Sequence, residues 1–150
     1  ATFEPLDEFD YQGQGWGLCY DGERLVMSDG SDRLTFRDPE TFEELGTLFV
    51  NIRGKPLAQL NELECVGDEV WANVWQSDTI VGIQASDGNV FASVDASEIS
   101  RDARVTSPEE VDVLNGIAHD PATGNWFLTG KYWSKLYEVR FVPREVTPAP

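Results

Sequence analysis

The sequence predicts an all-β fold made of β-propeller blades. Residues 15–38, 61–84 and 115–140 repeat one order of elements: a short strand, a turn rich in Asp and Gly, an apolar strand, a polar turn and a third strand. The repeats recur every 46 to 54 residues. Four antiparallel strands at this period are typical of propeller blades. The register of the repeats argues against the alternative, a single β-sandwich.

Each repeat begins with a predicted hairpin. Its turn lies at residues 20–23, 66–69 and 120–125 of the three repeats. Glycine supplies positive φ in these turns, and Asp or Asn bonds its own backbone. A second polar turn, with Ser31-Asp32 or Ser77-Asp78, precedes the third strand in the first two repeats.

Short runs suited to half-buried strands complete the repeats. Third strands are predicted at 34–36, 80–83 and 136–139, and fourth strands at 46–50 and 90–94. The third repeat lacks a fourth strand, because the chain then enters a Pro-containing tail with little folding potential. We therefore expect a partial propeller over 1–143, with blades at about 13–50, 59–95 and 112–142, and a flexible tail at 144–150.

A leading strand is predicted at residues 3–11, before the first repeat. Three blades and one strand cannot close a ring, and an open propeller leaves sheet faces uncovered. We therefore expect the ring to be completed by N-terminal blades of a longer protein, by blades supplied in trans, or by a homo-oligomer.

Composition excludes several classes of partner. The chain has 27 acidic and 11 basic residues and a net charge of −16, which disfavours nucleic acid and anionic membranes because both are polyanions. No apolar run approaches the roughly 20 residues that span a bilayer, and the first residues lack the pattern of a signal peptide. With one His and two separated Cys, the sequence offers no zinc constellation, and we expect no metal or cofactor.

Polar and aromatic residues recur on one side of the repeats, where the first strand begins and the second strand ends. If the first strands line a central channel, these residues ring one of its mouths. They are Gly15-Trp16, Asn61-Glu62 and Asn115-Gly116 at the strand starts, and Asp29, Trp75 and Lys131 at the strand ends. Aromatic walls with a few polar groups predict a small-ligand pocket.

Each member of this set also has a structural interpretation. Trp16 and Trp75 are then core packing, and the asparagines are turn formers. Lys131 then rests its stem on the neighbouring rings with its ammonium in water, and the carboxylates are solvated. The clustering of all these positions favours the pocket.

The two cysteines, Cys19 and Cys65, occupy the same place in the first strands of their repeats. This position allows a bridge between neighbouring inner strands. Two small buried thiols are the alternative. Two cysteines alone do not identify a redox compartment.

The strings GWGL, LNELE, VWANVWQSD, VLNGIAHDP and LTGKYWSKLYEVR resemble the glutaminyl-peptide cyclotransferases of plant and bacterial type. The similarity runs from about residue 11 to residue 142. It implies a five-bladed propeller, of which this chain holds the C-terminal three blades. The implied activity converts the N-terminal Gln of peptides or proteins to pyroglutamate with release of ammonia, without a metal. Because this family is often exported, the resemblance also implies an extracytoplasmic location, secreted or periplasmic.

The resemblance assigns roles to four of the clustered residues. Trp16 and Trp75 are implied to enclose the glutamine side chain, Asn61 to hydrogen-bond the substrate, and Lys131 to bind the amide oxygen as it gains negative charge. The family's acid–base glutamate lies in a GEGL string that is absent here. Glu62 occupies its pseudosymmetric position and is a secondary catalytic candidate.

Two alternatives to the enzyme remain open. One is a non-catalytic partial propeller that binds peptides or self-assembles, which the absence of a GEGL string favours. The other is an oligomeric β scaffold with a different ligand, suggested by the acidity and the open sheet edges.

Overall fold

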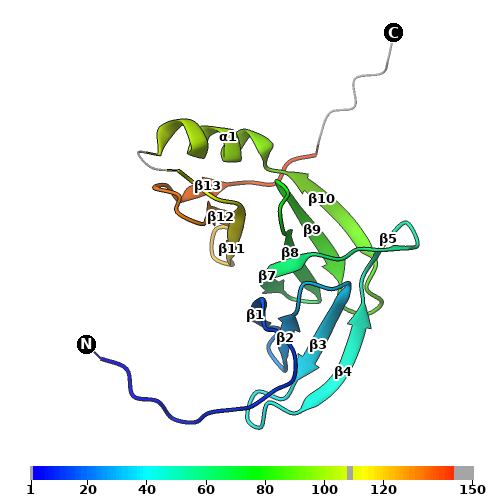
Figure 1. The fold of residues 1–150 in the computed structure, drawn as a ribbon. Coiled ribbons are helices and arrows are strands. Elements are labelled where there is room, and N and C mark those ends of the chain that lie inside the picture. Colours follow the sequence, from blue (N-terminus) through cyan, green and yellow to red (C-terminus); the bar gives the residue numbers. More distant parts are fainter. Residues whose placement is uncertain (1, 108–109, 144–150) are drawn as a thin grey trace.

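The protein is an all-β arrangement of sheets that fan out around one side (Figure 1). The computed structural model describes residues 2–107 and 110–143, so the predicted tail at 144–150 lies outside the described residues. Blade 1 contains β1 (Gly17–Tyr20), β2 (Leu25–Ser28), β3 (Arg33–Arg37) and β4 (Glu44–Phe49). Blade 2 contains β7 (Leu60–Val66), β8 (Glu69–Val74), β9 (Thr79–Gln84) and β10 (Val90–Asp95). Blade 3 contains β11 (Leu114–Asp120), β12 (Asn125–Gly130) and β13 (Tyr137–Val139).

Strand order within each blade follows the sequence, and all neighbours are antiparallel. The three predicted hairpins are confirmed, since the flanking residues pair as Tyr20 with Leu25, Val66 with Glu69, and Asp120 with Asn125. Blade 3 has three strands, as predicted. The fold is therefore a partial propeller, whose inner strands β1, β7 and β11 lie on the concave side of the fan (Figure 1).

The predicted leading strand is wrong. Residues 2–11 form no strand and share no backbone hydrogen bond with the described strands. The segment is instead held by its aromatic rings. Phe9 stacks on Phe42 at 5.8 Å between ring centroids, and Tyr11 meets Phe42 edge-on at 5.5 Å. This is a side-chain attachment to the β3–β4 turn rather than an additional strand.

Two elements were not predicted from the sequence. The first is a small hairpin of β5 (Asn51–Ile52) and β6 (Lys55–Pro56) between blades 1 and 2. The second is α1 (Ser97–Thr106), which follows blade 2, with Glu98 in its first turn and Arg104 in its last. An acidic residue in the first turn and a basic residue in the last turn are favourable for the helix dipole. This charge pattern is the sequence signal that could have predicted the helix. Nowhere in residues 2–107 and 110–143 is a helix long and apolar enough to cross a membrane.

Blade 2 is buried on both faces, because each face packs against a neighbouring blade. Successive side chains of β8 alternate between the faces. Val70 and Ala72 join the apolar cluster shared with blade 1, whereas Trp71 joins the cluster shared with blade 3. The Trp71 ring lies 5.0 Å from Trp126 and 5.2 Å from Phe141, measured between centroids. These two clusters fix the positions of the three inner strands relative to one another.

A disulfide joins the first two inner strands. Cys19 of β1 and Cys65 of β7 are bonded, with 5.5 Å between their Cα atoms. The sequence left open whether these cysteines form a disulfide or two buried thiols, and the structure contains the disulfide.

The inner strands β1 and β7 also approach closely at Gly17. A Cβ atom there would overlap the backbone carbonyl of Asn61, which cannot move without displacing β7. We expect Gly17→Ala to lower the free energy of unfolding by about 1–3 kcal/mol, the usual cost of overpacking. Urea unfolding monitored by circular dichroism measures this change.

The matched control is Gly46→Ala in β4, where a Cβ would meet no atom within 4 Å. Its free energy of unfolding should stay within about 0.5 kcal/mol of the wild-type value. Equal effects of the two substitutions would contradict the close approach of β1 to β7.

Candidate functional site

A cavity of about 360 Å³ opens where the inner strands begin. All three blades contribute to it, and its lining residues are Gly15, Trp16, Asn61, Trp75, Asn115 and Lys131. All six belong to the set of strand starts and strand ends identified from the sequence. The structure therefore brings these residues together, while their roles toward a ligand remain predictions.

β-Bulges orient the two asparagines. The pairing of β7 with β8 shifts register between Leu60 and Leu63, and Asn61 lies in this irregularity. The pairing of β11 with β12 shifts between Leu114 and Gly116, and Asn115 lies in that one. A bulge redirects a side chain and ends regular pairing, which is why bulges are frequent beside active sites. The same irregularity thus recurs in blades 2 and 3 and aims an asparagine at the cavity in each.

Matching backbone hydrogen bonds hold the residues at the ends of the second strands. The Trp75 N–H donates to the carbonyl of Gln59 at 2.8 Å, two residues before Asn61. The Lys131 N–H donates to the carbonyl of Val113 at 3.0 Å, two residues before Asn115. Trp75 and Lys131 therefore occupy equivalent positions in their blades, although their side chains have unrelated chemistry.

Two indole rings form the apolar wall of the cavity. Trp16 and Trp75 meet edge-to-face, with 5.2 Å between centroids and 79° between planes. Edge-to-face pairs of this kind are favourable because the positive edge of one ring meets the negative face of the other. The Trp16 Nε1–H donates to the Gln14 side-chain oxygen at 2.8 Å, which fixes the orientation of that ring. Both rings are half-buried, so part of each faces the cavity.

The polar groups of the cavity are available to a ligand. Lys131 forms no ion pair with a carboxylate in the described part of the chain, whereas Lys135 pairs with Asp102 at 2.9 Å. Asn61 is only 6% exposed. Its backbone carbonyl accepts the Ser28 hydroxyl hydrogen at 2.6 Å, while its side-chain amide has no hydrogen-bond partner among residues 2–107 and 110–143.

Two carboxylates of the predicted set do not line the cavity. Asp29 turns away to accept hydrogen bonds from Ser31 and from Arg33, the latter at 2.8 Å. Glu62 reaches across to blade 3, where its Oε2 accepts the Ile117 N–H at 3.1 Å. The predicted catalytic role of Glu62 is not tested by this geometry and stays a prediction.

Burial raises the pKa of Glu62 to about 7 from an ordinary value of 4.5. The Ile117 N–H lowers this pKa, and the charge of Glu64 on the same strand raises it. The Glu64 carboxylate lies nearby because it accepts the His119 N–H at 3.0 Å. Two carboxylates of β7 thus attach to the backbone of β11.

This shift predicts a pH-dependent stability. In the folded protein Glu62 keeps its proton up to about pH 7, whereas the unfolded chain loses it near pH 4.5. The folded state therefore binds more protons in this interval, and the free energy of unfolding falls as pH rises through it. Glu62→Gln should remove this loss and stabilise the protein at pH 8 by about 1–2 kcal/mol, since solvent screens part of the penalty.

Thermal unfolding at pH 5 and pH 8 measures the effect, with Glu23→Gln in an exposed turn as the control. The control should show the wild-type pH dependence. A Glu62→Gln protein with the same pH dependence would mean that Glu62 is charged at no cost in the folded state.

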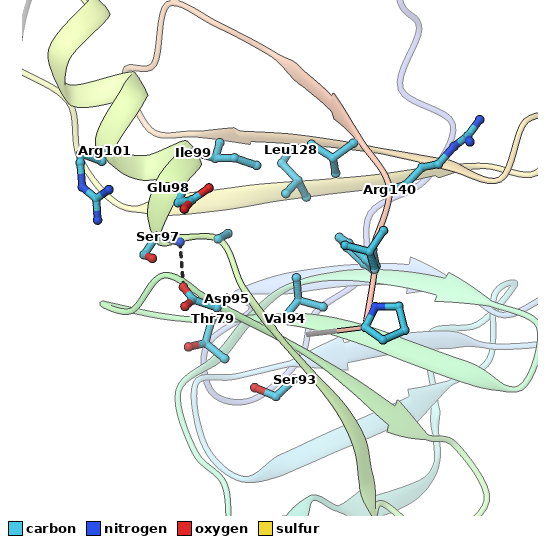
Figure 2. A pocket seen from close by; sticks show the side chains of 15 residues that line it. Thr79, Ser93, Val94, Asp95, Ser97, Glu98, Ile99, Arg101, Leu128 and Arg140 are labelled. Atoms are coloured by element: carbon cyan, nitrogen blue, oxygen red, sulfur yellow. Dashed lines mark hydrogen bonds between the residues drawn. The ribbon is translucent and has the colours of Figure 1, made fainter. Parts of the chain in front are cut away.

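A second, larger cavity lies away from this site. It has a volume of about 810 Å³ and lies between β10, the start of α1 and the segment that follows β13 (Figure 2). Val94, Ile99 and Leu128 contribute apolar side chains, and the Asp95 carboxylate accepts the Ser97 N–H at 3.0 Å at its edge. No residue of the predicted site lines it.

Metal ligands do not cluster in the described residues. Across residues 2–107 and 110–143, no group of three His, Cys, Asp or Glu side chains is arranged to hold a metal ion.

Comparisons with known proteins agree on one family. The family model described as "Glutamine cyclotransferase" matches residues 1–141. A "Glutaminyl-peptide cyclotransferase" of Arabidopsis thaliana is 43% identical over 126 residues, which are 84% of this chain and 39% of the plant protein. The crystal structure of a glutaminyl cyclase from Myxococcus xanthus superposes with a TM-score of 0.83 at 42% identity, over 88% of this chain and 57% of the bacterial one. The chain therefore spans about two fifths to three fifths of the length of these relatives.

Proposed function

Because this chain belongs to the glutamine cyclotransferase family, we propose that the protein converts the N-terminal glutamine of peptides and proteins to pyroglutamate and releases ammonia. The family predicted from the GWGL, LNELE and GKYW strings is confirmed by the match over residues 1–141. The observation that carries the proposed activity is the cavity, where two indole rings, two carboxamides and one lysine from three blades converge. The plant relative carries this activity in its name.

The reaction is an intramolecular acyl transfer. The neutral α-amine nitrogen forms a bond to the carbon of the side-chain amide, and the bond from that carbon to the amide nitrogen breaks. One proton passes from the attacking amine to the leaving nitrogen, which departs as ammonia. Because the nucleophile and the carbonyl belong to one residue, a site that holds the folded conformer supplies much of the rate.

The tryptophans select that conformer. Trp16 and Trp75 meet edge-to-face along one wall and leave an apolar surface against which a compact glutamine side chain packs. An apolar wall excludes water and strengthens the electrostatic interactions within the cavity. Asn61, whose amide is unpartnered in the described structure, hydrogen-bonds the substrate and fixes its orientation.

Lys131 stabilises the charge that develops during the reaction. In the tetrahedral intermediate the amide oxygen becomes negative, and a fixed cation aimed at it acts mainly in the transition state. Lys131 has no carboxylate partner in the described structure that would neutralise it before the substrate binds.

Proton transfer requires a group with a pKa near the working pH. The resemblance assigns this task to a glutamate in a GEGL string, which this sequence lacks. Glu62 is its pseudosymmetric counterpart and has a pKa raised to about 7. It takes part directly only if its carboxyl leaves the Ile117 N–H and turns into the cavity.

The remaining proposals concern assembly and location. Since the chain spans 39% and 57% of its relatives, further blades close the ring, either in the same protein, in trans or from another copy. The Cys19–Cys65 bridge supports an extracytoplasmic location, because disulfides persist mainly in oxidising compartments.

Ammonia release from a Gln-initiated dipeptide tests the proposed activity in the native protein. The control is the same dipeptide with an acetylated α-amine, which cannot cyclise. The mass of the native particle, measured by light scattering, shows which of the assembly proposals is correct. No ammonia above the control would overturn the activity, and dipeptide binding without ammonia release would identify a peptide-binding module instead.

A further inference from the structure

Asn115 is the polar lining side chain to which neither the resemblance nor the comparisons give a role. It lies in the bulge of β11, at the position that Asn61 occupies in β7. Its side chain lines the cavity together with Lys131 of the same blade.

One hydrogen bond to the backbone of β7 orients the amide of Asn115. The Glu62 backbone N–H donates to its Oδ1 at 3.4 Å. Only the oxygen of a carboxamide can accept such a bond, so the oxygen faces β7 and the NH₂ group is the remaining polar end. That NH₂ group has no hydrogen-bond partner in the described residues. Asn115 therefore offers two N–H donors, while its oxygen faces β7 and accepts one hydrogen bond there.

Lys131 is held beside the strand that carries Asn115. The Lys131 N–H donates to the Val113 carbonyl at 3.0 Å, and the Asp112 N–H donates to the Lys131 carbonyl at 3.0 Å. This pair of backbone bonds ties residue 131 to the start of β11 on both sides. The two residues thus share one hydrogen-bonded backbone frame, and both side chains line the cavity.

The charge of the cavity lining is favourable for a ligand group that becomes negative. The chain has 27 acidic residues, yet none of the six lining residues carries a carboxylate. Besides the two indoles, its polar side chains are one cation and two carboxamides.

We propose that Asn115 is a second oxyanion donor, whose Nδ2–H binds the substrate amide oxygen together with Lys131 Nζ as the tetrahedral intermediate forms. This inference rests on the proposed cyclotransferase activity. Because the bond strengthens as the oxygen gains charge, it lowers the barrier more than it tightens substrate binding.

Asn115→Ala and Asn115→Asp in the native protein test this role. Aspartate keeps an oxygen for the Glu62 N–H and replaces the donor by an anion, so it preserves the strand contact and opposes the oxyanion. We expect kcat for ammonia release to fall on the order of 10²-fold in Asn115→Ala and at least as far in Asn115→Asp. KM should change less than about threefold in Asn115→Ala, the pattern of a transition-state interaction.

The matched control is Asn125→Ala, at the other end of the same hairpin, where the side chain bonds Glu138 and Arg140 on the surface. Its kcat should equal the wild-type value. Wild-type kcat in Asn115→Ala, or a rise in KM with kcat unchanged, would overturn the donor role. If Asn115→Ala does not fold, Asn115→Asp decides the question. Wild-type kcat in Asn115→Asp would also overturn the donor role. An inactive wild-type protein would overturn the proposed activity itself, and this inference with it.

Discussion

Lys131→Met is expected to lower kcat for ammonia release by about 10²–10³-fold, with a smaller change in KM. Methionine keeps much of the length and the apolar stem of the side chain but removes the charge and the N–H donors. Lys131 lines the cavity and has no carboxylate partner in the described chain, so no ion pair has to be broken before its charge meets the reacting oxygen. Steady-state kinetics with a Gln-initiated dipeptide measures both constants.

The control for Lys131 is Lys135→Met in the same blade. Lys135 pairs with Asp102 at 2.9 Å on the surface and does not line the cavity. This variant should keep wild-type kcat and KM, so that a general effect of reducing the positive charge of an acidic protein is ruled out. Wild-type kcat in Lys131→Met would reject a role in stabilising the oxyanion.

The second large effect is expected from the disulfide. Replacing Cys19 and Cys65 by alanine should lower the free energy of unfolding by about 4 kcal/mol, because the bond closes a loop across a sequence separation of 46 residues. The bond also joins the two inner strands that carry Trp16 and Asn61 near their starts. Removing the disulfide should therefore lower the activity at temperatures where blades 1 and 2 begin to separate. Urea unfolding of the double variant, followed by ammonia release at rising temperature, measures both effects.

Reduction of the wild-type protein provides the comparison for the disulfide. Dithiothreitol should bring the wild-type protein close to the stability of the double variant and should leave the double variant unchanged. A loss below about 1 kcal/mol would mean that blades 1 and 2 hold their positions through apolar packing alone.

The repeated unit made most of the fold predictable. Hairpin turns with Gly and Asp occur at equivalent positions, so the strand ends of one blade identify those of the next, and this comparison located all six lining residues. The bulges at Asn61 and Asn115 were not visible, because register depends on cross-strand pairing that no local pattern encodes. For the same reason the orientation of Glu62 toward Ile117 could not be foreseen.

Two segments show where local pattern fails. Residues 3–11 contain aromatic and apolar side chains suited to a strand, yet a strand exists only beside a partner, and here the rings attach to Phe42 instead. Helix α1 lies between two blades and is not part of the repeat, so comparison of the repeats could not reveal it.

The equivalent positions of Trp75 and Lys131 have a consequence for protein engineering. Each side chain projects from an equivalent hydrogen-bonded backbone position in its own blade, and neither belongs to the buried clusters between the blades. The side chains that line the cavity at these two positions can therefore be changed without changing the apolar packing that holds the sheets together. A combinatorial library restricted to positions 75 and 131 would vary the shape and charge of the recognised group while leaving the scaffold intact, so new ligand selectivities could be sought with few variants lost to misfolding.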